Sequence, residues 1–418
     1  MKLKFLYLYF FLVFLLGCGR REFGLTLAVG GAPNEVEYWE ELIKEFESKT
    51  HIEVKTLRQP SDTDLRRQGL VIPLKAKKED PDVFLMDVAW VAQFAASGWL
   101  LPLDSYIKQD NFDMSNLFSQ VVNQVDVYKG KIIALPVYVD CGLLYFRKDL
   151  LKKYNLSIPK TWKELLKYAK KIQKEERKKN PYFYGFVWQG AQYEGLICNF
   201  IEFIASNEGK ILNKNITLAI KENIEALQFM KDLIHKHKIS PPNTYTEMKE
   251  EETRIYFEKG NALFERNWPY AWKLHNNSSL KGKIGITILP KFKKHATALG
   301  GWHIGISRYS DRKEDAWKLL NFILSYNIQK RLALDLGWNP ARKDIYDDPE
   351  IKEKMPHIKI LKKALMHAVA RPNIPYYTQI SEILQKYINA AISKNIKPEK
   401  ALERAEKEIK KIEKAYHE

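Results

Sequence analysis

Cysteine is scarce in this chain, with three residues, Cys18, Cys141 and Cys198, among 418. Cys141 and Cys198 lie beyond the apolar N-terminal segment. Two cysteines are too few for a disulfide framework in a chain long enough to build large cores. We therefore expect Cys141 and Cys198 to be buried thiols. Histidine is also sparse, and His235 and His237 are two residues apart, which on a helix turns them to different sides. The sequence thus predicts neither a metal site nor a bound cofactor.

Motifs that mark nucleotide-dependent and acyl-transfer enzymes are missing as well. The chain has no G-x-S-x-G nucleophile elbow, no P-loop and no dinucleotide fingerprint, and the pair Gly282 and Gly285 is too weak a signal to count. Internal repeats, low-complexity tracts and flexible linkers are absent from the sequence too. Two compact units, if present, must therefore be joined through ordered segments.

Long hydrophobic runs are confined to the N-terminus. A basic head precedes an apolar run, Phe5 to Leu16, which is too short to span a bilayer as a mature helix and predicts a signal peptide over residues 1–17. The run ends in Leu-Leu-Gly-Cys and resembles the bacterial lipobox, so we expect Cys18 to carry lipid and residues 18–24 to form a tether. The alternatives are an uncleaved anchor helix and a plain secretory signal with an ordinary cysteine.

Length and composition favour two folded lobes. A chain of 418 residues exceeds the size of a single growing core, and 45% hydrophobic with 12% aromatic residues supply ample core material. The net charge of +17 would fit a nucleic-acid binder, but the excess gathers in stretches such as residues 152–179, where the lysines fall around an amphipathic helix instead of interleaving with aromatics. A solvated, Lys- and Glu-rich helical surface explains the charge better.

Hydrophobic periodicity predicts an α/β fold. Short apolar or alternating runs at 25–29, 52–57 and 82–87 read as strands, and the segment after the first has helical spacing with Asn34 and Glu37 as an N-cap pair. Strand and helix alternate again further on, where Thr161 and Glu164 are placed as a capping box. From residue 311 onward the pattern is nearly all helical. The sequence therefore predicts sheets covered by helices.

Three chain crossings between the two lobes are expected, near residues 139–140, 283–286 and 325–326. They divide the chain into an N-terminal lobe of residues 25–139 and 285–325, and a C-terminal lobe of residues 140–284 and 326–418. Crossings of this kind make a hinge between the lobes possible.

Polar residues follow several predicted strands, where an α/β sheet places its ligands. They are Glu35, Ser61, Arg66, Asp87, Tyr138 and Asp140. Each has a plain structural alternative, such as starting a helix or lying at the surface. Together they predict a cleft of carboxylates and one arginine, and a sugar hydroxyl, which both donates and accepts, suits that mixture.

Aromatic residues complete such a site, because the C–H face of a pyranose packs on an indole or phenol ring. Within "NWPYAW", Pro269 favours the first turn of a helix, so Trp268 is expected at a loop-to-helix entry. We assign Trp268 and Tyr270 to the ligand and Trp272 to the core. In "GGWH", Gly301 allows backbone to approach a ligand and Trp302 opens an alternating strand.

A glycosidase is the enzyme alternative, since it needs a carboxylate pair at the scissile bond. However, an arginine near these acids should hold them ionised with a lowered pKa, which disfavours a general acid. We therefore predict no enzymatic activity.

The residues also resemble a known family over nearly the whole chain from residue 25. The similar stretches include "AVGGAPNEVEYW", "DPDVFLMDVAW", "ALPVYVD", "FERNWPYAW", "LGGWHIGIS", "LGWNP" and "RPNIPYY". They resemble the extracytoplasmic solute-binding proteins of sugar ABC importers in the maltose-binding class, most of all the trehalose/maltose-binding members.

That resemblance implies a periplasmic-binding-protein-like fold, with two α/β lobes, a three-strand hinge and an oligosaccharide between the lobes. It assigns sugar contacts to the residues above, and adds Arg371 in "RPNIPYY". Ser61 stands where the relatives have threonine, which keeps the hydroxyl and loses a methyl group.

The implied function is high-affinity binding of an α-glucoside such as trehalose, maltose or a short maltodextrin, with sucrose left open, and delivery to an ABC permease by ligand-induced closure. A monomer at the outer face of the cytoplasmic membrane, or in the periplasm, is expected, with no nucleic-acid partner.

Overall fold

The computed structural model describes residues 24–31, 33–212 and 216–417. The predicted signal peptide and the lipidated Cys18 fall on residues 1–23 and lie outside the described part. Within that part, no helix has both the length and the apolar character needed to cross a membrane.

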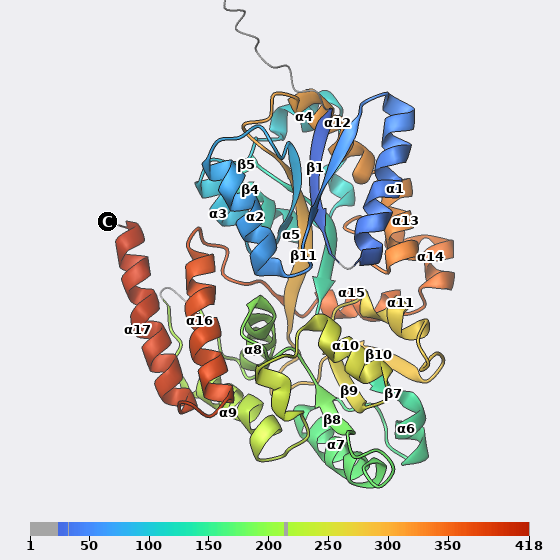
Figure 1. The fold of residues 1–418 in the computed structure, drawn as a ribbon, viewed down its shortest axis with the longest axis vertical. Coiled ribbons are helices and arrows are strands. Elements are labelled where there is room, and N and C mark those ends of the chain that lie inside the picture. The colour runs from blue at the N-terminus through green and yellow to red at the C-terminus, as the bar shows by residue number, and fades with distance from the viewer. Residues whose placement is uncertain (1–23, 32, 213–215, 418) are drawn as a thin grey trace, which may run out of the picture.

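The first lobe is built on a six-stranded sheet (Figure 1). Its order is β12-β11-β3-β1-β2, and β6 also pairs with β11. β1 is parallel to β2 and β3, whereas β11 runs antiparallel to β3 and β6. The strands are β1 (Leu25–Gly30), β2 (Val54–Gln59), β3 (Val83–Asp87), β6 (Leu135–Cys141), β11 (Thr297–Ile306) and β12 (Ala368–Val369).

The second lobe is built on a four-stranded sheet of order β10-β7-β9-β8. β8 and β9 are parallel, and the other two pairings are antiparallel. The strands are β7 (Leu143–Arg147), β8 (Tyr184–Val187), β9 (Ala262–Asn267) and β10 (Ile284–Ile288). A separate hairpin joins β4 (Val127–Tyr128) to β5 (Lys131–Ile132).

Helices cover both faces of the first sheet. Successive residues of β1 turn to opposite faces, so Leu27 packs in the core with α1, α12 and α13 while Ala28 packs in the core with α2 and α3. The helices of this lobe are α1 (Pro33–Thr50), α2 (Thr63–Lys75), α3 (Val91–Ala96), α4 (Asp104–Gln109), α5 (Ser119–Val121), α12 (Lys313–Ile323) and α13 (Tyr326–Leu336), with η1 (Met114–Asn116) and η2 (Val122–Asp126).

Helices also enclose the second sheet, where Leu144 and Leu143 of β7 face different cores. The predicted capping box is confirmed, because Thr161 and Glu164 bond reciprocally at the start of α7. The helices are α6 (Lys148–Lys153), α7 (Trp162–Glu176), α8 (Glu194–Ser206), α9 (Lys221–His235), α10 (Glu250–Glu258), α11 (Ala271–Asn276), α14 (Pro349–Lys354), α15 (Ile358–Leu365), α16 (Tyr377–Ile392) and α17 (Pro398–His417), with η3 (Pro242–Tyr245) and η4 (Asp344–Asp347).

The chain passes between the lobes at three places, and two of them lie later than expected. The first crossing is at Gly142, between β6 and β7. β10 pairs with β7, so residues 285–288 belong to the second lobe and the crossing falls between β10 and β11. The side chains of α13 pack mainly in the core of the first lobe, so the third crossing follows Leu336.

The start of the first helix also differs from the prediction: α1 begins at Pro33, so Asn34 lies inside the helix and not at its N-cap.

Candidate functional site

A cavity of about 320 Å³ lies between the two lobes. Its size suits a small organic ligand. Side chains from both sheets and from the loops beyond them form its wall. The structure brings all the residues predicted for the site to this one wall: Glu35, Ser61, Arg66, Asp87, Tyr138, Asp140, Trp268, Tyr270, Gly301, Trp302 and Arg371.

Three neighbouring strands of the first lobe align one row of this wall. Trp302 of β11 is paired with Asp87 of β3 on one side and with Tyr138 of β6 on the other. Directly opposite residues in a sheet project from the same face, so these three side chains enter the cavity together. The Tyr138 ring also stacks on Trp338 at a centroid distance of 4.1 Å, which fixes the ring's orientation.

Glu35 stands in the first turn of α1, where the helix N-terminus favours a negative charge. Its Oε1 accepts a hydrogen bond of 2.8 Å from Trp338 Nε1. Trp338 therefore supports two wall residues at once, the carboxylate of Glu35 and the ring of Tyr138.

Arg66 comes from the first turns of α2 and is 3% exposed. Its guanidinium carbon lies 3.6 Å from the Trp302 ring centroid, which is close enough for a cation–π contact. Burial lowers the pKa of Arg66 to about 10, against the pull of nearby acids. Among the described residues, its Nε has no hydrogen-bond partner. Arg66 lines the cavity, although this Nε atom is itself shielded from solvent.

Asp140 is the complementary acceptor. It is 8% exposed, and its Oδ1 has no hydrogen-bond partner among the described residues. Burial, with the Glu35 carboxylate, raises the pKa of Asp140 to about 8 despite Arg266. The expectation that a nearby arginine would hold the cleft acids ionised with a lowered pKa is therefore wrong at this position, because desolvation outweighs the attraction.

Trp268 and Tyr270 form the wall of the second lobe. The Trp268 ring lies over Arg266 at 3.9 Å, and its Nε1 donates to Glu250 Oε1 over 3.2 Å. The Tyr270 hydroxyl donates to Glu251 Oε1 over 2.8 Å. Trp272 is not among the residues that line the cavity, and its ring packs on His357 at a centroid distance of 4.7 Å. The expected division of "NWPYAW" into wall and core is thus what the structure has.

Two glycines let β11 pass close to its neighbours. Gly301 has φ of +123°, and a Cβ there would lie 2.4 Å from the Tyr138 carbonyl oxygen. A Cβ at Gly300 would meet the Trp268 ring at 2.9 Å. The register shifts between Trp302 and His303, and this irregularity sets the direction of the Trp302 side chain.

Arg371 lies in the segment between β12 and α16, and its side chain is 3% exposed. Its Nη2 is 2.8 Å from Asp87 Oδ1 in the first lobe, and its Nη1 is 3.0 Å from Glu194 Oε1 in the second. Burying a single charge is costly, and these two carboxylates compensate that cost for the Arg371 guanidinium. Arg371 therefore ties the two lobes together at the floor of the cavity, a role the sequence did not predict.

Several further wall residues were missed from the sequence. Tyr193 and Glu194 stand at the start of α8, and Lys249 precedes the acidic first turn of α10. The run "KEEE" at residues 249–252 could have indicated the second group, since acidic first turns are typical of helix starts. For Tyr193 and Glu194 no local signal exists, because α8 is apolar nearly throughout.

The arrangement pairs acceptors and donors with aromatic faces. Asp140 and Arg66 supply one of each, and Trp302, Trp268, Tyr138 and Tyr270 supply rings on both sides. Cys141 and Cys198 are free and buried, as expected, and Cys198 reaches the wall. Such a cavity is built to hold a neutral polyhydroxylated molecule with apolar C–H faces.

Comparison with known proteins gives consistent matches. The model of the family described as bacterial extracellular solute-binding protein matches residues 32–330. A probable ABC transporter-binding protein of Deinococcus radiodurans is 35% identical over 375 residues, 87% of each chain. A maltotriose-binding protein of Pyrococcus abyssi is 27% identical over 82% of this chain and 72% of its own.

Among solved structures, maltose-bound MalE3 of T. maritima is 39% identical, with a TM-score of 0.87 over 93% of this chain and 99% of its own. The predicted periplasmic-binding-protein-like fold of two α/β lobes is therefore confirmed.

Proposed function

The chain belongs to the bacterial extracellular solute-binding proteins, and from this premise we propose that it captures an α-glucoside outside the cytoplasm and delivers it to an ABC import permease. Trehalose, maltose and a short maltodextrin are the candidate ligands. One observation carries the proposal: Asp140 and Arg66, an acid and a guanidinium, line one cavity together with aromatic rings from both lobes. The likeness to maltose-bound MalE3 and to a maltotriose-binding protein supports the choice of sugar.

The wall residues divide the recognition of a sugar between them. A hydroxyl can donate to the Asp140 carboxylate and accept from the Arg66 guanidinium, since both residues line the cavity. Pyranose C–H faces can pack on the rings of Trp302 and Trp268. Because Trp302 belongs to the first lobe and Trp268 to the second, a sugar touches both only when the lobes are closed.

Lobe closure is the mechanism that this division supports. A ligand shifts an open–closed equilibrium by the difference between its affinities for the two states. Contacts made across the cleft exist in the closed state alone, so the sugar favours closure. The permease would then recognise the closed form, which carries the sugar. No covalent step is needed. We expect the protein to act as a monomer and to leave the sugar unchanged.

The N-terminal leader supports an anchored location. Lipid on Cys18 would hold the protein at the outer face of the membrane, with residues 18–24 as the tether. Metabolic labelling with a lipid precursor should mark the wild-type protein and leave a Cys18→Ala variant unlabelled. Labelling of that variant would exclude this anchor.

The function is tested by calorimetry of the mature protein with trehalose, maltose, maltotriose and sucrose, combined with a reducing-sugar and glucose assay after long incubation. We expect saturable binding of at least one α-glucoside and no released product. Product release would favour a glycosidase. Binding that is indifferent to sugars and falls steeply with salt would favour a nucleic-acid binder.

A further inference from the structure

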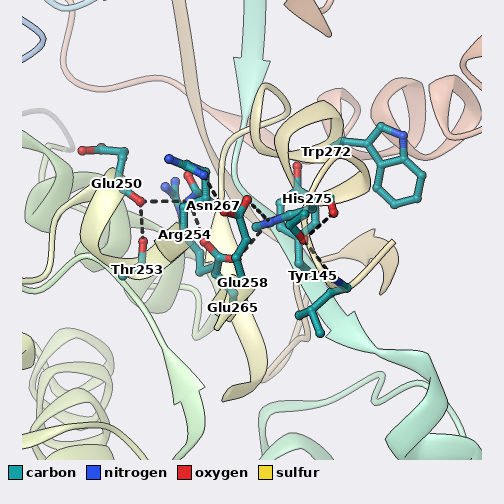
Figure 2. Close-up of polar contacts among 12 residues, drawn as sticks. Tyr145, Glu250, Thr253, Arg254, Glu258, Glu265, Asn267, Trp272 and His275 are labelled. Carbon is teal, nitrogen blue, oxygen red and sulfur yellow. Dashed lines mark hydrogen bonds and ion pairs between the residues drawn. The ribbon is translucent and has the colours of Figure 1, made fainter. Parts of the chain in front are cut away.

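A buried histidine lies behind the aromatic wall of the second lobe. His275 belongs to α11, is 0% exposed and does not line the cavity. Its Nδ1 is 3.1 Å from Glu258 Oε1, and its Nε2 is 2.9 Å from Glu265 Oε2. Figure 2 shows the ring between these two carboxylates. Each nitrogen of the ring therefore faces an acidic oxygen.

This geometry favours the charged form of the histidine, with the Nδ1 contact hydrogen-bonded and the Nε2 contact at ion-pair distance but not aligned as a hydrogen bond. A neutral imidazole has one N–H, so one of its nitrogens is an acceptor, and an ionised carboxylate only accepts. Both contacts are attractive only when both nitrogens carry protons. Burial opposes that charge, yet the Glu265 and Glu258 carboxylates together raise the pKa of His275 above its usual value.

One chain of contacts leads from His275 to Tyr270. Glu258 Oε2 accepts from Arg254 Nη1 over 2.6 Å, and Arg254 Nη2 bonds Glu251 Oε2 over 2.6 Å. Glu251 in turn holds the Tyr270 hydroxyl at 2.8 Å. The position of this phenol thus depends on the charges around His275.

A second chain leads from His275 to Trp268. Glu265 Oε1 accepts from Asn267 Nδ2 over 2.6 Å, and Asn267 Oδ1 accepts from the Trp268 backbone N–H over 2.8 Å. The Tyr145 hydroxyl donates to the Trp268 carbonyl over 2.8 Å, and the Tyr145 ring meets the His275 ring edge-on at 4.8 Å. The backbone of Trp268 is therefore held from two sides by groups in contact with His275.

We propose that His275, as an imidazolium, is a positioning residue for the Trp268 and Tyr270 wall, so that sugar affinity falls when the ring loses its proton. The idea rests on the proposed function. The groups that face the ring are Glu258 and, through it, Arg254 on α10, Glu265 on β9 and Tyr145 on β7. When the ring loses a proton, the carboxylates of Glu265 and Glu258 compete for a single N–H. The contacts that lead to Tyr270 and to Trp268 then weaken together.

The direction of the effect follows from the raised pKa. The favourable charge is fully present at low pH and is lost as the pH rises through the pKa of His275 in the folded protein. Asp140 acts oppositely, because its ionisation at higher pH improves it as an acceptor. The two effects therefore oppose each other in the wild-type profile, and the His275 effect is the difference between the wild-type and His275→Gln profiles.

The test is maltose affinity of the full mature chain from pH 6 to pH 10, by tryptophan fluorescence, for wild type and His275→Gln. We expect the wild-type Kd to rise by about tenfold across the His275 titration. His275→Gln should bind weakly at pH 6 and show no such rise. His357→Gln is the control: the pKa of His357 is lowered to about 4 by burial, so that ring is neutral throughout, and the wild-type rise should persist. A wild-type affinity and profile in His275→Gln would overturn the proposal.

Two further readouts keep the proposal testable if that variant does not fold or maltose does not bind. Glu258→Gln alters a partly exposed partner, and should move the midpoint of the wild-type rise to lower pH. Nitrogen-15 NMR of the sugar-free protein should show both His275 nitrogens protonated at pH 7, and the Trp268 indole signal should shift with the His275 titration. Coupled titration without maltose binding would uphold the positioning role and refute the sugar assignment. Independent titration would refute the positioning role.

Discussion

Lys249 Nζ lies 2.6 Å from Asp62 Oδ2, and the two residues cap helices on opposite lobes. Asp62 is the N-cap of α2 and accepts from two backbone N–H groups there, so its carboxylate is held in place. Lys249 precedes α10. The side chain of Asp62 is 22% exposed and that of Lys249 is 40% exposed, which places the ion pair at the rim of the cavity, where it joins the two lobes.

Replacing Lys249 by Met should weaken sugar binding by a modest factor. The pair is partly exposed, and such pairs contribute about 0.2–1 kcal/mol, so we expect a Kd increase of roughly two- to fivefold in calorimetry at low salt. The wild-type protein should approach the variant at high salt. Lys178→Met, which removes an exposed pair with Glu175 on the distant α7, is the control and should leave Kd unchanged. Equal affinities of wild type and Lys249→Met at low salt would show that the contact does not favour closure.

Trp268→Ala and Trp272→Ala form a matched pair within one hexapeptide. Trp268 lines the cavity, whereas Trp272 packs on His357 in the second-lobe core. We expect Trp268→Ala to raise Kd by at least about tenfold, since an aromatic ligand contact is worth 1.4 kcal/mol or more. Trp272→Ala should lower Tm and leave the affinity nearly unchanged. The reverse pattern would mean that the ring assignments are exchanged.

Sugar binding at pH 7 should release protons. With the lobes arranged as in this structure, the Asp140 pKa, raised to about 8 mainly by burial, leaves this carboxyl largely protonated when no sugar is bound. A hydroxyl that donates to the carboxylate stabilises the ionised form and lowers the pKa. Calorimetry in buffers of different ionisation enthalpy should therefore show net release, and Asp140→Asn should show none. Proton uptake in the wild-type protein would contradict this direction.

The same carboxyl affects stability in the sugar-free state. Because its folded pKa is higher than its unfolded value, the contribution to stability is fully present below about pH 4 and is lost as the pH rises through about 8. The Tm of the sugar-free protein should fall over this interval more in wild type than in Asp140→Asn.

Arg371→Met should destabilise the protein strongly. The change leaves the buried carboxylates of Asp87 and Glu194 without their shared cation, and breaking a buried ionic contact in this way costs about 3–5 kcal/mol. The free energy of urea unfolding should show this loss. A double variant with Glu194→Gln should recover part of it, because one of the stranded charges is removed. No recovery would mean that packing of the arginine stem, rather than charge, dominates.

Much of the site was predictable because its residues follow strands that are evident locally. The runs at 25–29 and 82–87 fix the ends of β1 and β3, so Glu35 and Asp87 had to lie near one sheet edge. The motif resemblance supplied Arg371, which no strand pattern indicates. The predicted residues all line one cavity, and they were found partly from strand patterns and partly from the motif resemblance.

The rest depends on contacts between distant parts of the chain. The pairing of β10 with β7 decides that β10 belongs to the second sheet. The lobe to which α13 belongs is decided by the core that its apolar face contacts. Neither choice leaves a local mark in the sequence. The protonation of Asp140 could not be predicted either, because it is set by how completely the folded lobes remove water from that carboxyl.

The three chain crossings have a consequence for how the protein is made. β6 pairs only with β11 among the described strands, and β3 needs β11 as its second neighbour. A growing chain that ends before residue 297 therefore exposes two unpaired, apolar strand edges, which are prone to join other chains. Neither lobe is a continuous stretch of synthesis, since α16 and α17 complete the second core last. Maturation must wait for nearly the whole polypeptide, and a fragment cut at the first crossing would aggregate rather than fold.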